Sequence, residues 1–178
     1  MFRMIIFSRP AKSWRRKHMK KTFLLKIVLI ISLLILAAPA LAGERAQKRG
    51  APAQAQDMVA RAVALFEEEG MKAAFDRFTN RPGAEFNHLD LYIFVLKAEE
   101  GARIVAHAGT RSLIGVNAAT LIDPGGLSIG RAILDKATAK GAWVDYGWKD
   151  PLTGKVAPKS SWVVRHKGHI FGCGIHKP

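Results

Sequence analysis

The N-terminal segment constrains the fold most, because its composition removes residues 1–42 from any folded core. A dense cationic run at residues 15–21 is followed by an almost wholly apolar stretch at 22–38, interrupted by Lys26. Ala-Leu-Ala at 40–42 then gives a small-x-small sequence ahead of polar residues. This order is typical of a secretory signal peptide. It predicts an exported protein with a cleaved leader.

Two alternatives concern the same segment. Met19-Lys20-Lys21 would itself open a conventional signal peptide, which suggests that the true start is Met19. An uncleaved leader would instead anchor the protein in the inner membrane, although the apolar stretch is shorter than the roughly 20 residues of a spanning helix. We expect a periplasmic or secreted protein, with the anchored form as the alternative.

The charge of the chain follows the same division. The formal net charge is +14, but residues 1–42 hold nine of the 28 basic residues and no acid, so the remainder carries only +5. This excess is spread too thinly for a nucleic-acid-binding surface. The chain has one cysteine, so no intramolecular disulfide can form. The exported part must rely on its own hydrophobic core.

The part after the leader divides into a spacer and one domain. Residues 43–56 are rich in Gln, Ala, Pro and Gly and predict a flexible spacer. From Asp57 to Asn80 apolar residues recur at helical spacing, interrupted at Gly70, which predicts a long N-terminal helix. The single domain is expected to cover residues 57–178.

Strand patterns follow this helix. Residues 91–96 are aromatic, aliphatic or β-branched throughout, which predicts a central strand with both faces covered. A hairpin partner is expected at 103–108, an amphipathic helix at 129–140, and further strands at 142–148, 161–165 and 169–175. This order predicts an α+β fold with an antiparallel sheet and helices segregated to one side.

Several motifs occur in a fixed order along this domain. They are Asp-Leu-Tyr-Ile-Phe-Val-Leu at 90–96, Val-Ala-His at 105–107, Leu-Ile-Gly-Val-Asn at 113–117, the Gly-Ala-Trp to Gly-Lys stretch at 141–155, Pro-Lys-Ser-Ser-Trp at 158–162 and Gly-Cys-Gly-Ile at 172–175. The series resembles the single Cache domain of bacterial sensors, type 2, over roughly residues 57–178. No second membrane segment or signalling module follows, so we expect a free-standing periplasmic form.

The resemblance implies a PAS-like fold, with a five-stranded antiparallel sheet, a long N-terminal helix and short crossover helices. It implies a non-catalytic sensor that needs no cofactor and binds a small organic acid such as lactate, pyruvate, acetate or propionate. A membrane receptor or sensor kinase, in chemotaxis or other signal transduction, is the implied partner. The N-terminal helix is the implied homodimer contact. A PAS-like structural or interaction protein without a small ligand is the alternative.

Strand alternation selects the candidate ligand-binding side chains. Tyr92 and Phe94 share a face, Tyr146 and Trp148 share another, and His107 is expected on the same face as Val105. An anion pocket needs apolar walls and a few well-aimed donors, of which a charged lysine is the strongest. With Trp162, where the family often has Tyr, the candidate site comprises Tyr92, Phe94, His107, Tyr146, Trp148, Lys159 and Trp162.

Each candidate also has an ordinary structural explanation. Tyr92 and Phe94 can be plain core packing, and Trp148 can simply cover the core. Lys159 can be a solvated loop lysine, and His107 a satisfied buried histidine.

Other reactive side chains do not suggest a second site. Cys173 and His176 would face opposite ways in a strand, which argues against a nucleophile pair and favours a buried, inert thiol. His166, His169 and His176 lack a further ligand cluster, which argues against a metal. We therefore expect no enzyme; hydrolysis through Cys173 is the remaining enzymatic alternative.

Overall fold

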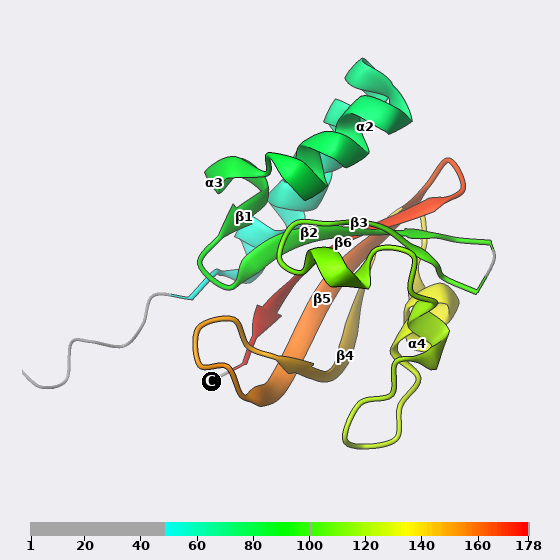
Figure 1. Cartoon of the computed structure of the whole chain (residues 1–178). Helices are drawn as coiled ribbons and strands as arrows, with labels where there is room; N and C mark the ends of the chain where they lie inside the picture. Colours follow the sequence, from blue (N-terminus) through cyan, green and yellow to red (C-terminus); the bar gives the residue numbers. More distant parts are fainter. Residues whose placement is uncertain (1–48, 100, 178) are drawn as a thin grey trace, which may run out of the picture. The chain divides into compact units, whose positions relative to one another are not determined.

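A computed structural model describes residues 49–99 and 101–177 of the chain (Figure 1). The predicted signal peptide, the start at Met19 and the membrane-anchor alternative lie outside these residues. Within them, no helix combines the length and the apolar character needed to cross a bilayer.

The long N-terminal helix, α2 (Pro52–Asn80), starts earlier than the predicted Asp57, so residues 52–56 belong to the helix rather than to the spacer. Proline is favoured in the first helical turn, and the side chain of Gln54 accepts a 2.8 Å hydrogen bond from the Ala51 N–H. The helix bends at Gly70, whose φ of 79° is open to glycine without strain.

The remaining elements follow in chain order. They are α3 (Gly83–Phe86), β1 (Asn87–His88), β2 (Leu91–Lys97), β3 (Ile104–His107), η2 (Arg111–Leu113), η3 (Ala118–Thr120), α4 (Ile129–Lys136), β4 (Ala142–Lys149), β5 (Val156–His166) and β6 (His169–His176). Helix α4 ends before the predicted Lys140. The Arg165 guanidinium donates to the carbonyl oxygens of Leu134 and Ala137 and so caps it.

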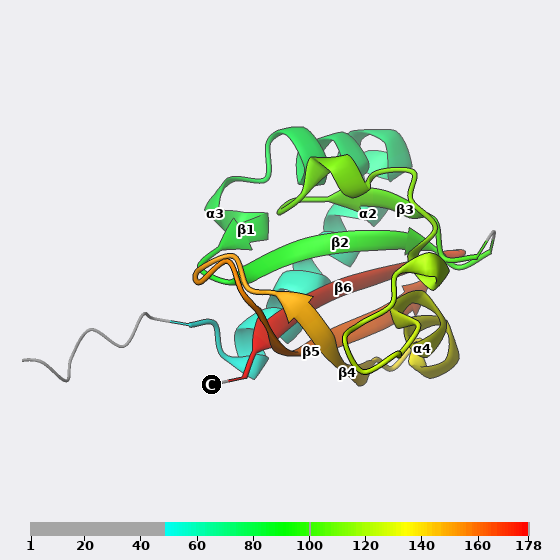
Figure 2. The ribbon, with the colours of Figure 1, turned by 60° about the horizontal axis from the view of Figure 1, so that its bottom comes forward.

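The strands form one antiparallel sheet in the order β3-β2-β6-β5-β4, with β1 beside β3 along the outer edge of β2 (Figure 2). The predicted α+β architecture, with a long N-terminal helix and an antiparallel sheet, is confirmed. The expectation that the helices lie on one side is wrong, because α2 covers one face of the sheet and η3 and α4 cover the other. The two-residue β1 adds a sixth strand to the five expected.

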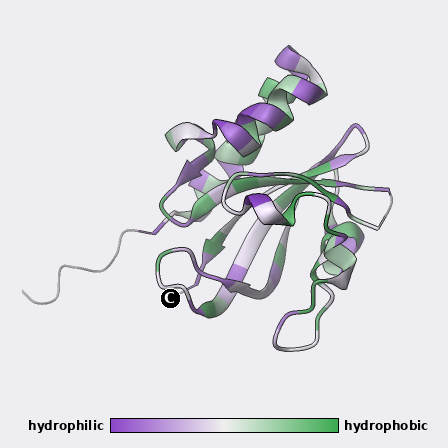
Figure 3. Cartoon of the chain, in the orientation of Figure 1, coloured by the Kyte–Doolittle hydropathy of each residue, from purple (hydrophilic) through white to green (hydrophobic). Residues whose placement is uncertain are grey.

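The sheet has an apolar layer on each face, and β2 contributes side chains to both layers. Leu91, Ile93 and Val95 pack towards α2, while alternate residues pack towards η3 and α4. All six residues from Leu91 to Leu96 are buried, as expected for a central strand. Figure 3 shows hydrophobic positions along the strands and a mixture of hydrophilic and hydrophobic positions along α2.

A β-bulge in β3 corrects one expectation about faces. Val95 pairs with Ala106 and Leu96 with Ile104, which leaves Val105 without a partner in the ladder. Because this extra residue breaks the alternation, Val105 packs with the α2 layer, whereas His107 pairs with Phe94 and faces the other layer. His107 and Val105 therefore do not share a face.

Candidate ligand-binding site

A small apolar cavity lies on the face of the sheet opposite α2. It is covered by the crossover, the segment with η2, η3 and α4 that connects β3 to β4. The volume of the cavity is about 30 Å³, enough to hold a water molecule. Aliphatic side chains of η3, α4 and the neighbouring loops cover it, and five aromatic rings of the sheet complete its wall: Tyr92, Phe94, His107, Tyr146 and Trp148. These five belong to the seven side chains selected from the sequence.

The aromatic side chains pack against one another in two groups. The His107 ring lies nearly parallel to Tyr92 and Phe94, with centroids 5.0 and 6.3 Å away. Tyr146 meets Trp148 edge to face at 6.3 Å. The Tyr146 hydroxyl shares a 2.7 Å hydrogen bond with the Ser161 hydroxyl. Burial raises the pKa of Tyr146, so this hydroxyl stays protonated and can donate.

His107 has a defined chemical state. Its Nδ1 accepts hydrogen bonds from the backbone N–H groups of Gly109 (3.1 Å) and Thr110 (2.8 Å). Burial, reinforced by the charge of Lys159, lowers the pKa of His107 to about 3. The ring is therefore neutral at pH 7 and carries its proton on Nε2, so it can offer a neutral donor to the cavity.

Lys159 lies beside the cavity rather than in solvent, which excludes its reading as a solvated loop residue. It is 1% exposed, and its Nζ lies 3.7 Å from the centroid of the Tyr92 ring. Burial lowers the pKa of Lys159 to about 7. The residue lines an adjoining open groove, which shares Tyr146 with the cavity.

Comparison with known proteins assigns this arrangement to a family. The family model of Single Cache domain 2 matches residues 52–169. The chain belongs to this family. Its members are non-catalytic, extracytoplasmic sensor domains. No curated protein matches the chain.

Solved structures show the same Cache fold. A methyl-accepting chemotaxis protein from Vibrio parahaemolyticus has a TM-score of 0.58 and 21% identity, over 69% of this chain and 86% of that one. A periplasmic sensor domain of a chemotaxis protein has a TM-score of 0.51 and 20% identity, covering 69% and 88%. A Cache chemosensory domain described for its recognition of carboxylic acids has a TM-score of 0.51 and 17% identity, covering 68% and 85%.

Two glycines of β6 make room for side chains on the cavity side of the sheet. A Cβ at Gly174 would lie 2.3 Å from both the Lys159 Cε and the Ser161 Oγ. A Cβ at Gly172 would lie 2.2 Å from the Phe94 ring. The bare backbone of β6 therefore lets Lys159 and Phe94 lie flat across the sheet.

Trp162 is the one candidate that the fold places elsewhere. It pairs across strands with Trp143 and Cys173, and all three lie in the α2 layer. Its ring packs 5.5 Å from that of Trp143. Strand alternation turns Trp162 away from the cavity, because the cavity-facing positions of β5 are Lys159, Ser161 and Val163. We therefore remove Trp162 from the candidate site of this Cache domain.

The other reactive side chains lie apart from the cavity. Cys173 is buried against Met58, and burial raises the pKa of its thiol to about 12. His166 contacts Glu67 on α2, and the Nδ1 of His169 faces the Lys167 carbonyl. Across the described part of this Cache domain, no three His, Cys, Asp or Glu residues are grouped to hold a metal.

Proposed function

We propose that this Cache domain binds a small organic acid of the lactate, pyruvate, acetate or propionate type as the input of an extracytoplasmic signal. The observation that carries the proposal is Lys159. Among the described residues, no carboxylate lies within 4.0 Å of its buried Nζ, so the ammonium is available to an anion. A structural relative described for carboxylic acid recognition supports the same ligand class.

The surrounding residues suit such a ligand. Its carboxylate would accept hydrogen bonds from Lys159 and from the Tyr146 hydroxyl, which connects groove and cavity. Its short carbon chain would lie against Phe94 and the aliphatic wall. The Nε2–H of His107 could donate to a hydroxyl or keto oxygen, so lactate and pyruvate would gain a contact that propionate lacks.

Binding requires movement, because a cavity of about 30 Å³ holds a water but not a carboxylic acid. We assign the movement to residues 121–128 of the crossover, because the part before them is hydrogen-bonded to β3 between Ile104 and the backbone of Gly115 and Val116. We propose that the crossover opens, closes around the acid and thereby changes the surface offered to a membrane receptor or sensor kinase. A homodimer contact through α2 is part of the same proposal.

The test is a thermal-shift and calorimetric screen with acetate, propionate, lactate and pyruvate. A ligand at 100 times its dissociation constant adds about 2.7 kcal/mol of stability. Lys159→Met and Tyr146→Phe should weaken binding, whereas Lys177→Met, which removes a lysine of the same groove that is paired with Asp145, should not. Unchanged affinity in Lys159→Met would contradict the assigned role.

A PAS-like protein without a small ligand is the second candidate, and the small volume of the cavity favours it. On this alternative, none of the four acids would stabilise the wild-type domain. A crystal structure grown with each acid would then show the same closed cavity.

A further inference from the structure

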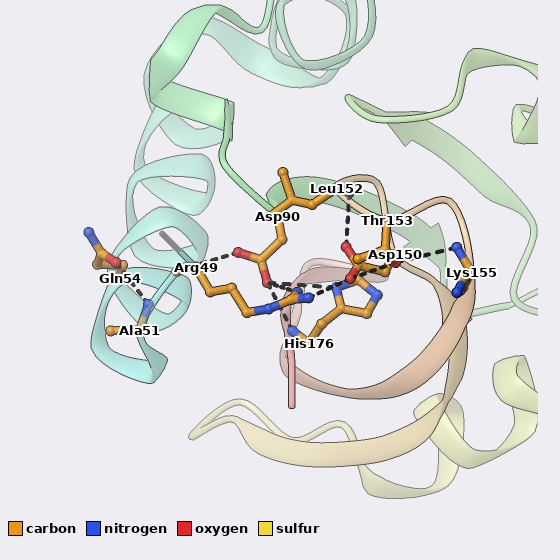
Figure 4. A network of polar contacts seen from close by, with 10 residues as sticks. Arg49, Ala51, Gln54, Asp90, Asp150, Leu152, Thr153, Lys155 and His176 are labelled. Atoms are coloured by element: carbon orange, nitrogen blue, oxygen red, sulfur yellow. Dashed lines mark hydrogen bonds and ion pairs between the residues drawn. The ribbon is translucent and has the colours of Figure 1, made fainter. Parts of the chain in front are cut away.

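A buried charged cluster lies at one end of the sheet, outside the cavity (Figure 4). The Arg49 Nη2 donates to the Asp150 Oδ2 at 2.7 Å, and the Arg49 Nη1 lies 3.7 Å from the Asp90 Oδ2. The Asp90 carboxylate accepts the backbone N–H of Gly50 (2.6 Å) and of His176 (3.0 Å). The cluster joins four segments: the chain before α2, the β1–β2 turn, the β4–β5 loop and the end of β6.

The cluster carries more negative than positive charge. Burial alone would raise the pKa of Asp90, but hydrogen bonds from His176 and Gly50 leave it well below its ordinary value. Burial likewise opposes the Arg49 hydrogen bond at Asp150, yet the pKa of Asp150 falls to about 2. Both carboxylates, which are at most 1% exposed, are therefore ionised and share one arginine.

Lys159 is the buried cation next to this cluster. It is the cross-strand partner of His176, and both face the ligand side of the sheet. The charges of Asp90 and Asp150 act on the Lys159 ammonium and favour its protonated form. The two acids thus balance part of the charge that we assign to ligand binding.

Two contacts of the cluster are long. The Arg49 Nη1 and the His176 Nδ1 each lie 3.7 Å from the Asp90 Oδ2, which is longer than a hydrogen bond, although both nitrogens are buried. A small shift of either side chain would therefore turn one of these contacts into a hydrogen bond. An anion that engages Lys159 would change the field at Asp90 and Asp150 and shift this balance.

We propose that the Arg49–Asp90–Asp150–His176 cluster couples occupation of the Lys159 site to the chain immediately before α2. The inference rests on the proposed function and deepens it, because it assigns positioning residues and an output segment to the same site. The coupling predicts opposite changes in anion affinity for loss of the arginine and loss of an acid. At a pH where Lys159 is protonated in every variant, removing Arg49 leaves the acids less compensated and disfavours an anion at Lys159, whereas removing one acid favours it.

The experiment uses the full chain and whichever of acetate, propionate, lactate and pyruvate binds the wild type most tightly. Calorimetry at about pH 5.5, where Lys159 is protonated, should show affinity weakened by about five-fold or more in Arg49→Gln and strengthened by a similar factor in Asp150→Asn. Arg49→Lys keeps the charge and should retain near wild-type affinity. Arg61→Gln, which removes an arginine paired with Asp57 on the surface of α2, is the matched control and should bind normally. Hydrogen exchange of residues 49–56 is measured with and without the acid.

Opposite changes of affinity in Arg49→Gln and Asp150→Asn, with acid-dependent exchange at residues 49–56, would support the coupling. General destabilisation cannot produce this pattern, because it would weaken binding in both variants. Equal affinities, a loss in both variants, or exchange at 49–56 that ignores the acid would overturn it. If the wild type binds none of the four acids, the proposed function fails and the coupling with it; binding without these effects refutes the coupling alone.

Discussion

At the residue scale, His107 shows how a fold fixes the chemical state of one side chain. The sequence predicts it as a ligand donor or as a satisfied buried histidine; Nδ1 fits the second description, and a donor role for Nε2 stays a prediction. Nδ1 is used by the backbone N–H groups of Gly109 and Thr110, while Nε2 is left with the proton. Neither bond could be foreseen, because the turn that aims these N–H groups back at the ring has no sequence signature.

His107→Phe is predicted to destabilise the domain, because the two backbone N–H groups lose their acceptor. Because Gly109 and Thr110 are exposed and water can partly replace the ring, the expected cost is about 0.5–1.5 kcal/mol for each hydrogen bond lost. His107→Asn keeps an acceptor near the position of Nδ1 and should be milder. Urea unfolding of both variants distinguishes them; equal losses would show that ring packing, not the acceptor, is what matters.

The pH dependence of binding is predicted from Lys159. Its pKa is about 7 in the folded protein, so the charged form that attracts an anion is lost above that pH. Affinity for a carboxylate should level off below about pH 6 and weaken by up to about ten-fold per unit above pH 7. Calorimetry from pH 6 to 9 measures this, and Lys159→Met should bind weakly at every pH. A flat profile in the wild type would rule out Lys159 as the titrating partner.

The contribution of Lys159 to the folding free energy changes with pH in the opposite direction to its effect on ligand affinity. An unfolded lysine binds its proton below about pH 10.4, while folded Lys159 does so only below about 7. Its contribution to stability is therefore full above the higher pKa and is lost as the pH falls through this window. Ligand binding and domain stability should thus vary oppositely between pH 7 and 9.

At the element scale, the sequence predicts the strands well and the details of their pairing less well. The uniform apolar run of β2 is recognisable as a strand, and the turn residues after β4 and β5 mark where these two strands end. The bulge at Val105 has no such signal, because alternation assumes an unbroken ladder, and it reverses the expected relation of Val105 to His107. The same alternation, applied to β5, would have turned Trp162 away from Lys159.

Gly172→Ala is predicted to strain the contact between β6 and β2. Its Cβ would lie 2.2 Å from the Phe94 ring, an overlap that typically costs about 1–3 kcal/mol. Phe94→Leu removes the ring and leaves space where the Cβ of residue 172 would lie. The double variant should therefore lose less stability than the sum of the two singles, as a double-mutant cycle in urea would show. Strict additivity would mean that the two positions do not share this space.

At the scale of the whole molecule, Asp123 makes the attachment of the crossover to the edge strand β4. Its carboxylate accepts the N–H of Gly125 and Leu127 within its own loop and, at 2.9 Å, the N–H of Gly147 on the edge strand β4. The sequence predicts a loop rich in Gly and Pro here. It does not predict the hydrogen bond between Asp123 and Gly147, because these residues meet only in the folded chain.

Asp123→Ala is predicted to release this loop and speed exchange of ligand. Association and dissociation rates should both rise, and amides of residues 121–128 should exchange hydrogen faster. Stopped-flow measurements and hydrogen exchange check these effects. Glu85→Ala, on the far side of the sheet near α2, is the control and should leave both unchanged. Unaltered rates in Asp123→Ala would show that the crossover opens elsewhere.

The two oxygens of Asp90 have a mechanical consequence. One accepts the N–H of Gly50, where the chain enters the domain, and the other accepts the N–H of His176, close to where the described chain leaves it. The Asp90 carboxylate thus ties the entering chain to the end of β6, and a force that separates these two segments would load it together with the flanking Arg49–Asp150 and Lys177–Pro158 hydrogen bonds.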